Sequence, residues 1–270
     1  MQVPKRRNFL FSALAIFATG ITSTWIFRRQ LVNKLLFNFA PNQDLAITDA
    51  PTDTSTCVLT SKQVEGPFYF PSKERSNVIE NKTGEFLNLK LQVVQYPDCS
   101  PVSGAVVEIW QADAEGNYSG YPEEISKDVW EMFMLFGKRG EKMPSGEYHV
   151  PPINTDTFLR GLQRTDENGW VTFETIVPCW YPNRVPHIHF KVFMNDNEWI
   201  NSQFYFDKEF CDELFSTKEP YTKMGVCPIE YQKDGVLFDV KGEQKGLYLS
   251  PKRNEKMVLA ADAIIGVQTA

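Results

Sequence analysis

The sequence predicts an all-β fold, an antiparallel β-sandwich with long loops. Two observations favour this class. The chain of 270 residues is rich in the aromatic residues that strands prefer, with 20 Phe, 10 Tyr and 6 Trp. Short apolar or alternating segments recur from residue 87 to residue 250, and turns that contain proline or glycine separate them. A single β domain of about 200–250 residues would accommodate all of these segments.

The first 56 residues are predicted to precede the domain, which would span residues 57–270. Arg6 and Arg7 stand directly before an apolar run at 9–27, which indicates a twin-arginine export signal within residues 1–30. An ordinary secretory signal and an uncleaved membrane anchor are the alternatives, since about 20 apolar residues can span a bilayer. Residues 31–56 are rich in Thr, Asp, Pro and Ala and lack periodicity, so they are predicted to be a linker.

Seven segments of the domain are predicted as strands. The first, "LNLKLQV" at 87–93, alternates apolar and polar residues, which is the pattern of a strand with one buried face. The segment "DENG" at 166–169 has the composition of a tight turn between strands. The other six predicted strands are 105–110, 171–176, 187–193, 202–206, 235–240 and 246–250.

One long insertion, residues 122–157, interrupts the series of strands. Its middle is compatible with a short helix. Long loops inside a compact domain are often functional lids, and a surface excursion without a function is the equally weighted alternative.

Five cysteines fit an oxidising compartment, which agrees with export. No two of them have the spacing of a zinc knuckle. Cys57 with Cys99 and Cys211 with Cys227 are candidate disulfides, although spacing alone does not determine connectivity. Cys179 would then be a buried thiol.

Two of the three histidines lie one residue apart in a predicted strand. Side chains alternate between the faces of a strand, so His187 and His189 point the same way and can share one metal ion. His149 lies in the insertion, and no carboxylate is close to the pair in sequence. A three-histidine zinc site or a two-histidine, one-carboxylate iron site is therefore not the natural interpretation.

Two tyrosines are candidate partners of these histidines. Tyr181 precedes His187 by six residues, and Tyr118 follows the predicted strand at 105–110. A phenol has a pKa of about 10, and it ligates as a phenolate only beside a strongly Lewis-acidic cation. Two phenolates and two imidazoles thus suit Fe(III). Tyr121 and Tyr205 are the rival tyrosine ligands.

At this point the sequence resembles the intradiol ring-cleavage dioxygenases, the family of catechol 1,2-dioxygenase and protocatechuate 3,4-dioxygenase. Several separated motifs agree with the family in their order, and the resemblance extends from about Cys57 to Phe206. It is most similar to the single-chain, exported branch. The motifs are "VEGPFYF" (64–70), "GAVVEIWQADAEGNYSGY" (104–121), "FLRGLQRTDENGWVTFETIVPCWYPNRVPHIHFKV" (158–192) and "SQFYF" (202–206).

The resemblance implies a role for each candidate residue. Arg184 matches the active-site arginine of the family, and Gln203 matches the polar residue beside the reacting ring. Tyr181 would be the ligand that leaves the metal when substrate binds and then acts as a base. The four Fe(III) ligands would be Tyr118, Tyr181, His187 and His189.

The resemblance also implies the reaction. A catechol-type diol would be cleaved by O₂ between its two hydroxylated carbons to give a cis,cis-muconate-type diacid. The partners would be the small aromatic diol and O₂. Nucleic acid is not expected because the formal net charge is −6, and a membrane would be met only through an uncleaved anchor. Two other functions stay open, an exported binding module without catalysis and a zinc hydrolase that uses His187 and His189.

Overall fold

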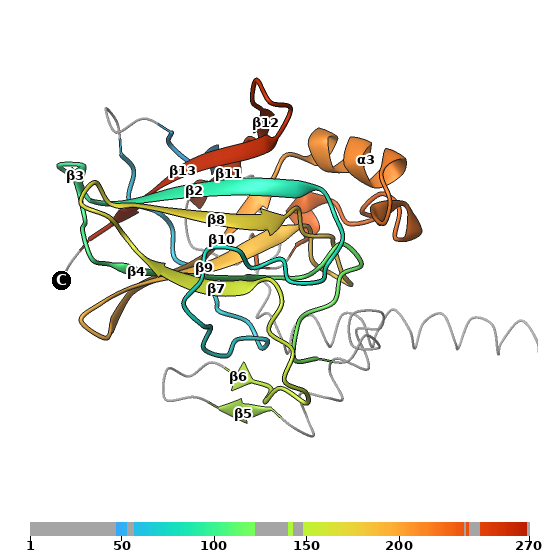
Figure 1. The fold of residues 1–270 in the computed structure, drawn as a ribbon, viewed down its shortest axis with the longest axis horizontal. Coiled ribbons are helices and arrows are strands. Elements are labelled where there is room, and N and C mark those ends of the chain that lie inside the picture. Colours follow the sequence, from blue (N-terminus) through green and yellow to red (C-terminus); the bar gives the residue numbers. More distant parts are fainter. Residues whose placement is uncertain are drawn as a thin grey trace, which may run out of the picture.

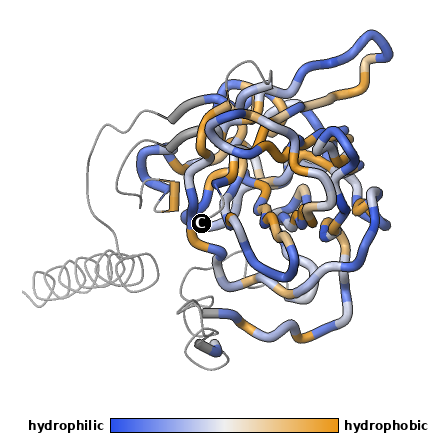
Figure 2. Tube along the Cα trace, turned by 90° about the vertical axis from the view of Figure 1, so that its left-hand side faces the viewer, coloured by the Kyte–Doolittle hydropathy of each residue, from blue (hydrophilic) through white to orange (hydrophobic). Residues whose placement is uncertain are grey.

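The computed structural model describes residues 47–52, 57–121, 140–142, 148–234, 236–237 and 244–268. In these residues two stacked β-sheets form the body of the molecule, and one α-helix lies at one end of it (Figure 1). The hydrophobic stretches lie mainly within the body, and the loops that project from it are largely hydrophilic (Figure 2). The predicted β-sandwich is therefore confirmed.

The first sheet has six strands in the order β1-β11-β10-β9-β4-β7. Strand β9 pairs with both β4 and β10 in antiparallel fashion. The six strands are β1 (Ile47–Asp49), β4 (Val106–Gln111), β7 (Arg160–Arg164), β9 (His187–Met194), β10 (Asn197–Phe206) and β11 (Gln244–Leu249).

The second sheet has five strands in the order β12-β13-β2-β3, with β8 also paired to β2. A separate two-stranded sheet consists of β5 (Glu141–Lys142) and β6 (Tyr148–His149). The strands of the second sheet are β2 (Phe86–Gln95), β3 (Ser100–Pro101), β8 (Trp170–Ile176), β12 (Lys252–Arg253) and β13 (Leu259–Val267).

The core lies between the two large sheets and follows the alternation of their strands. In β2 the alternate residues Leu87, Leu89 and Leu91 are fully buried, as the sequence pattern predicts. In β9 the alternate residues Ile188 and Phe190 are fully buried in the same core cluster. One face of β9 thus packs into the sandwich, and its histidines lie on the other face.

The pairing of the strands is mixed, which corrects the expectation of an antiparallel sandwich. Strand β2 pairs with β13 in parallel, and β10 pairs with β11 in parallel. Parallel neighbours need a long connection instead of a tight turn, and most of the domain separates β2 from β13. Strand β13 was not expected from the sequence, because residues 259–267 are rich in alanine, which strands favour little.

The prediction of a strand at 235–240 is wrong for the two residues of this segment that the structure describes. Val236 and Leu237 lie in a turn. Their backbone N–H groups both donate to the carboxylate of Asp234, each at 3.0 Å. A side chain therefore takes the hydrogen bonds that a neighbouring strand would have taken.

The helix α3 (Lys208–Thr217) was also not expected from the sequence. Asp207 caps its N-terminus by accepting a hydrogen bond from the backbone N–H three residues further on, at 3.0 Å. Cys211, Leu214 and Phe215 are its buried residues. This i, i+3, i+4 spacing is helical, but ten residues give the pattern little length in which to show.

Cys57 and Cys99 form a disulfide, as predicted. The two residues are 42 positions apart, and a loop of that size contributes about 4 kcal/mol to stability in the chain-entropy account. The bond ties the beginning of the domain to the turn after β2.

The predicted Cys211–Cys227 disulfide is wrong, because both thiols are free and buried. Each thiol has a partner of its own. The hydroxyl of Tyr231 donates to Sγ of Cys211 at 3.9 Å, and Sγ of Cys227 donates to the carbonyl oxygen of Ile229 at 3.8 Å. Cys179 is the third free and buried thiol, as expected.

The predicted export signal, residues 1–30, lies outside the described residues, as does most of the insertion, including the middle where a helix was expected. Within the predicted linker, Ile47–Asp49 forms β1, which pairs in parallel with β11. No helix in the described ranges is long and apolar enough to cross a membrane. The domain boundaries stay predictions.

Candidate metal centre

The outer face of the six-stranded sheet, which points away from the second sheet, carries the two histidines of β9. Cross-strand pairing places Trp110 of β4 and Gln203 of β10 on either side of His189, and Tyr205 of β10 beside His187. Both histidines are almost completely buried, with exposed fractions of 1% for His187 and 2% for His189. This end of the outer face is therefore covered by other parts of the protein and is not exposed to solvent.

A tight turn after β4 brings Tyr118 to this face. The carboxylate of Asp113 organises the turn by accepting hydrogen bonds from two of its backbone N–H groups, both at 2.9 Å. Gly116 in this turn has a φ of +80°, and a Cβ there would lie 2.7 Å from the carbonyl oxygen of Trp180. Only glycine allows the turn to approach the segment around residue 180 so closely.

A second turn, "YPNR" at 181–184, presents Tyr181 and Arg184 together. The backbone N–H of Arg184 donates to the carbonyl oxygen of Tyr181 at 2.9 Å. Asn183 has a φ of +67° and follows Pro182, as in a type II turn. The ends of the turn face each other, and Nη1 of Arg184 donates to the hydroxyl oxygen of Tyr181 at 3.4 Å.

Four side-chain atoms from three segments of the chain meet at one point. Nε2 of His187 lies 3.1 Å from Nε2 of His189, 3.2 Å from the hydroxyl of Tyr118 and 3.3 Å from the hydroxyl of Tyr181. Nε2 of His189 lies 3.1 Å from the hydroxyl of Tyr118. Such spacings suit neighbouring ligands of one first-row metal ion, whose bonds to nitrogen and oxygen are about 2.0–2.2 Å long.

The protonation of the histidines fits a metal site. Nδ1 of His187 lies 2.6 Å from the carbonyl oxygen of Val185. Because that oxygen can only accept, Nδ1 carries the proton and Nε2 presents its lone pair to the centre. Burial holds the pKa of both His187 and His189 well below the ordinary value, so both rings are neutral.

The protonation of the tyrosines decides what kind of metal fits. Burial raises the pKa of Tyr118 and of Tyr181 above the ordinary value, and Tyr181 raises that of Tyr118 further, whereas Arg184 opposes both shifts. In the protein alone both hydroxyls therefore keep their protons. They would ligate as phenolates only to a cation of high charge density, and the four residues thus fit the Fe(III) that the sequence resemblance implies.

Arg184 lies beside this centre with only 3% of its residue exposed. Its Nη2 donates to Oε1 of Gln203 at 2.5 Å, and its Nε donates to the carboxylate of Asp234 at 3.1 and 3.2 Å. Burial opposes the charge, but Asp234 and the nearby tyrosines hold the pKa of Arg184 above its ordinary value. The guanidinium is therefore a permanent positive charge next to the four donor atoms.

Gln203 connects Arg184 to the segment 64–70, which covers the centre. Its Nε2 donates to the carbonyl oxygen of Val64 at 3.0 Å, while its Oε1 accepts from Arg184. Gly66 in the same segment is so close that a Cβ there would lie 3.6 Å from Cε1 of His189. The structure thus brings Gln203 next to Arg184, and Arg184 lies between Gln203 and the hydroxyl of Tyr181.

The rival tyrosines have other partners. The hydroxyl of Tyr121 donates to the carbonyl oxygen of Val150 at 2.7 Å. The hydroxyl of Tyr205 lies 3.0 Å from Oε1 of Gln63 and 3.2 Å from Oε1 of Gln203. The geometry therefore favours Tyr118 and Tyr181 as the tyrosine donors.

The third histidine belongs to a different group. Nε2 of His149 lies 3.0 Å from Oε1 of Glu65, whose Oε2 lies 3.1 Å from Nζ of Lys191. Lys191 also pairs with Glu198 at 2.8 Å. His149 is therefore engaged in a charged cluster further along the same face of β9.

Sequence reasoning missed three residues around the centre. The indole ring of the fully buried Trp110 stacks on the imidazole of His189, with 4.6 Å between ring centroids. Arg160 is paired with Trp110 across the sheet and donates to Oγ of Ser119 at 2.7 Å. Once the pairing of β4 with β7 and β9 is known, alternation along the strands places Trp110 and Arg160 on the same face as His189. Asp234 lies 50 positions from Arg184, and no signal in the sequence connects the two.

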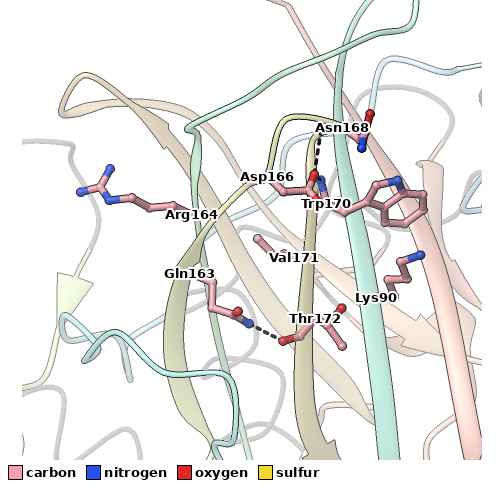
Figure 3. A pocket seen from close by; sticks show the side chains of 8 residues that line it. All are labelled: Lys90, Gln163, Arg164, Asp166, Asn168, Trp170, Val171 and Thr172. Carbon is pink, nitrogen blue, oxygen red and sulfur yellow. Dashed lines mark hydrogen bonds between the residues drawn. The ribbon is translucent and has the colours of Figure 1, made fainter.

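A hollow of about 620 Å³ lies at a different place, over the ends of β7 and β8 (Figure 3). Two of its polar side chains form hydrogen bonds with the protein's own backbone. Gln163 donates to the carbonyl oxygen of Thr172, and the carboxylate of Asp166 accepts from the backbone N–H groups of Asn168 and Trp170. None of the predicted site residues lines this hollow.

Comparisons with known proteins agree with the geometry of the centre. A protein-family model described as "Dioxygenase" matches residues 64–226. The chain is 24% identical over 168 residues to catechol 1,2-dioxygenase 1 of Acinetobacter lwoffii, which is 54% of this chain and 44% of that protein. It is 25% identical over 119 residues to chlorocatechol 1,2-dioxygenase of a Pseudomonas species, which is 42% of this chain and 41% of that protein. The chain therefore spans less than half of the length of these two relatives.

A solved structure covers more of the fold. An intradiol ring-cleavage dioxygenase from Tetranychus urticae is 29% identical and superposes with a TM-score of 0.65. The match covers 78% of this chain and 95% of that one. The sandwich described above is thus shared over almost the whole of the solved protein.

Proposed function

Because the chain belongs to the intradiol ring-cleavage dioxygenase family, we propose that it is a non-haem Fe(III) dioxygenase that acts on a catechol-type diol. It would cleave the ring between the two hydroxylated carbons, and both atoms of O₂ would enter a cis,cis-muconate-type diacid. One observation carries the proposal: Nε2 of His187 lies within 3.1–3.3 Å of Nε2 of His189 and of the hydroxyls of Tyr118 and Tyr181. The names of the catechol and chlorocatechol dioxygenases that resemble the chain support the class of substrate.

The four donors would divide into three that hold the metal and one that leaves it. Tyr118, His187 and His189 would stay bound, and Tyr181 would give up its place to the diol. When bound, the ferric ion supplies Lewis acidity, which favours the diolate and withdraws electron density from the ring. The phenolate oxygen of Tyr181 would then be free to accept a proton from a substrate hydroxyl. Nη1 of Arg184, 3.4 Å from that oxygen, stabilises the phenolate until the proton arrives.

Arg184 has a second task at the ring. A buried guanidinium in a fixed position stabilises negative charge that develops on the substrate, and it needs no reorganisation during the reaction. Gln203 and Asp234 hold this group by its Nη2 and its Nε. Surrounding aromatic residues restrict the access of water to the centre; those packed in one cluster with the two tyrosine donors include Phe68, Trp110 and Tyr121.

A visible absorption spectrum of the purified chain tests this function. We expect a broad band from charge transfer between tyrosinate and Fe(III), and a shift to longer wavelength when catechol is added without O₂. Metal analysis of the same sample should find iron in about equimolar amount. A chain that stays colourless after ferric reconstitution would favour the binding module, and stoichiometric zinc would favour the hydrolase.

We also propose that the chain is exported through a twin-arginine signal at residues 1–30. The Cys57–Cys99 disulfide supports an oxidising destination. Replacing Arg6 and Arg7 by lysine is expected to retain the protein in the cytoplasm, with Cys57 and Cys99 reduced. Cell fractionation with thiol alkylation measures both effects. Unchanged export of the lysine variant would contradict the twin-arginine route.

A further inference from the structure

The carboxylate of Asp234 is fully buried and occupied by hydrogen bonds on both oxygens. Three of its donors are backbone N–H groups, those of Val185 at 2.8 Å and of Val236 and Leu237 at 3.0 Å. The fourth donor is Nε of Arg184, at 3.1 Å from Oδ2 and 3.2 Å from Oδ1. Backbone groups from two segments thus hold the carboxylate in place independently of the arginine.

This carboxylate occupies only one edge of the guanidinium of Arg184. The terminal nitrogens are directed to the centre, with Nη1 at 3.4 Å from the hydroxyl of Tyr181 and Nη2 at 2.5 Å from Oε1 of Gln203. The guanidinium is planar and rigid, so a partner that fixes Nε also fixes where Nη1 and Nη2 point. We propose that Asp234 is the residue that positions Arg184 for the reaction.

Asp234 also balances the charge of Arg184. A guanidinium this deeply buried is costly unless a carboxylate accompanies it. Gln203 and Tyr181 offer hydrogen bonds to the terminal nitrogens but no full negative charge in the protein alone. Asp234 is the carboxylate that the structure pairs with Arg184.

Asp234 lies outside the part of the chain that the family model matches. The family model matches residues 64–226, which include Arg184 but not Asp234. The aspartate follows a 3₁₀ turn at Tyr231–Lys233, in a part of the chain that the matched motifs do not reach. A segment outside the match to the family model would thus determine the orientation of Arg184, which lies within that match.

The inference rests on the proposed function, and a double-mutant cycle on the full chain tests it. Asp234→Asn is expected to lower kcat for catechol by about 10- to 100-fold, because misplacement of a catalytic group by ~1 Å costs about 10²-fold. The iron content and the visible band of the resting protein should not change, and KM should change much less than kcat. In the Arg184→Ala background, Asp234→Asn should cause no further loss of kcat, because the aspartate acts through the arginine.

Thermal unfolding of the same proteins without iron supplies a readout that does not depend on activity. Arg184→Ala leaves the buried carboxylate without its cation, so we expect a lower Tm than in the wild type. Adding Asp234→Asn should then lower the Tm by less than the same change lowers it in the wild type, because no guanidinium is left unpaired. Asp262→Asn, on an exposed position of β13, is the matched control and should change neither kcat nor Tm.

Three results would overturn the inference: wild-type kcat in Asp234→Asn, kcat losses that multiply in the double variant, or Tm losses that add. Asp234→Glu keeps the charge but displaces the carboxylate by one methylene group, and it provides the cycle if the asparagine variant does not fold. A wild-type protein that binds no iron and does not turn over would contradict the proposed function instead. The Tm cycle would still test the Arg184–Asp234 pair in that case.

Discussion

Tyr118→Phe is expected to lose iron and to reduce turnover of catechol by about 10³-fold or more. Removing the hydroxyl takes away one of four donor atoms, the one that lies 3.1 Å from His189 and 3.2 Å from His187. A bound metal ion would supply several kcal/mol of transition-state stabilisation, and each 1.36 kcal/mol is about tenfold in rate. Iron content, the visible band and kcat under ferric saturation measure the effect.

Tyr121→Phe is the matched control, since it removes the same atom from a tyrosine three positions away. The hydroxyl of Tyr121 donates to the carbonyl oxygen of Val150 and is not among the four donors. Its loss should cost one buried hydrogen bond, about 1 kcal/mol of stability, and should leave the colour and the iron content unchanged. If Tyr121→Phe bleached the protein and Tyr118→Phe did not, the tyrosine ligand would have been assigned to the wrong residue.

Arg184→Ala is expected to keep the iron colour and to lower kcat by about 10²–10³-fold, the usual cost of removing one preorganised electrostatic group. Arg184 contacts Tyr181, Gln203 and Asp234 but is not a donor to the centre, so the metal should remain. Charge stabilisation on the substrate and on the released phenolate would both be lost. Stopped-flow measurements with catechol, before and after O₂ is admitted, separate binding of the diol from turnover.

Arg184→Lys should not restore the rate. Lysine keeps the charge but lacks the planar guanidinium. In Arg184 the Nε of this group donates to Asp234, and its Nη1 and Nη2 donate to Tyr181 and Gln203. Full turnover in the lysine variant would mean that charge alone suffices. A colourless Arg184→Ala variant would show that the residue supports the metal and not the reaction.

Most of the site could be predicted because its residues carry local signals. The His187–His189 pair follows from alternation in one strand, and the turn at 181–184 brings Arg184 to Tyr181 over four residues. The position of Tyr118 relative to them depends on long-range pairing of β4 with β9. The sequence indicated that tyrosine through its place after the predicted strand at 105–110 and through the ordered agreement with the family motifs.

The sequence was sufficient to predict the class of fold and the faces of the central strands, because alternation and tight turns are local properties of the chain. Together with the order of the family motifs, it also indicated four candidate donor residues. It did not determine that β2 and β13 run in parallel, that Cys211 and Cys227 stay apart, or that Asp234 reaches Arg184. These features depend on which distant segments pack together. Such packing is decided by the burial of whole surfaces and the satisfaction of buried polar groups, which no short stretch of sequence records.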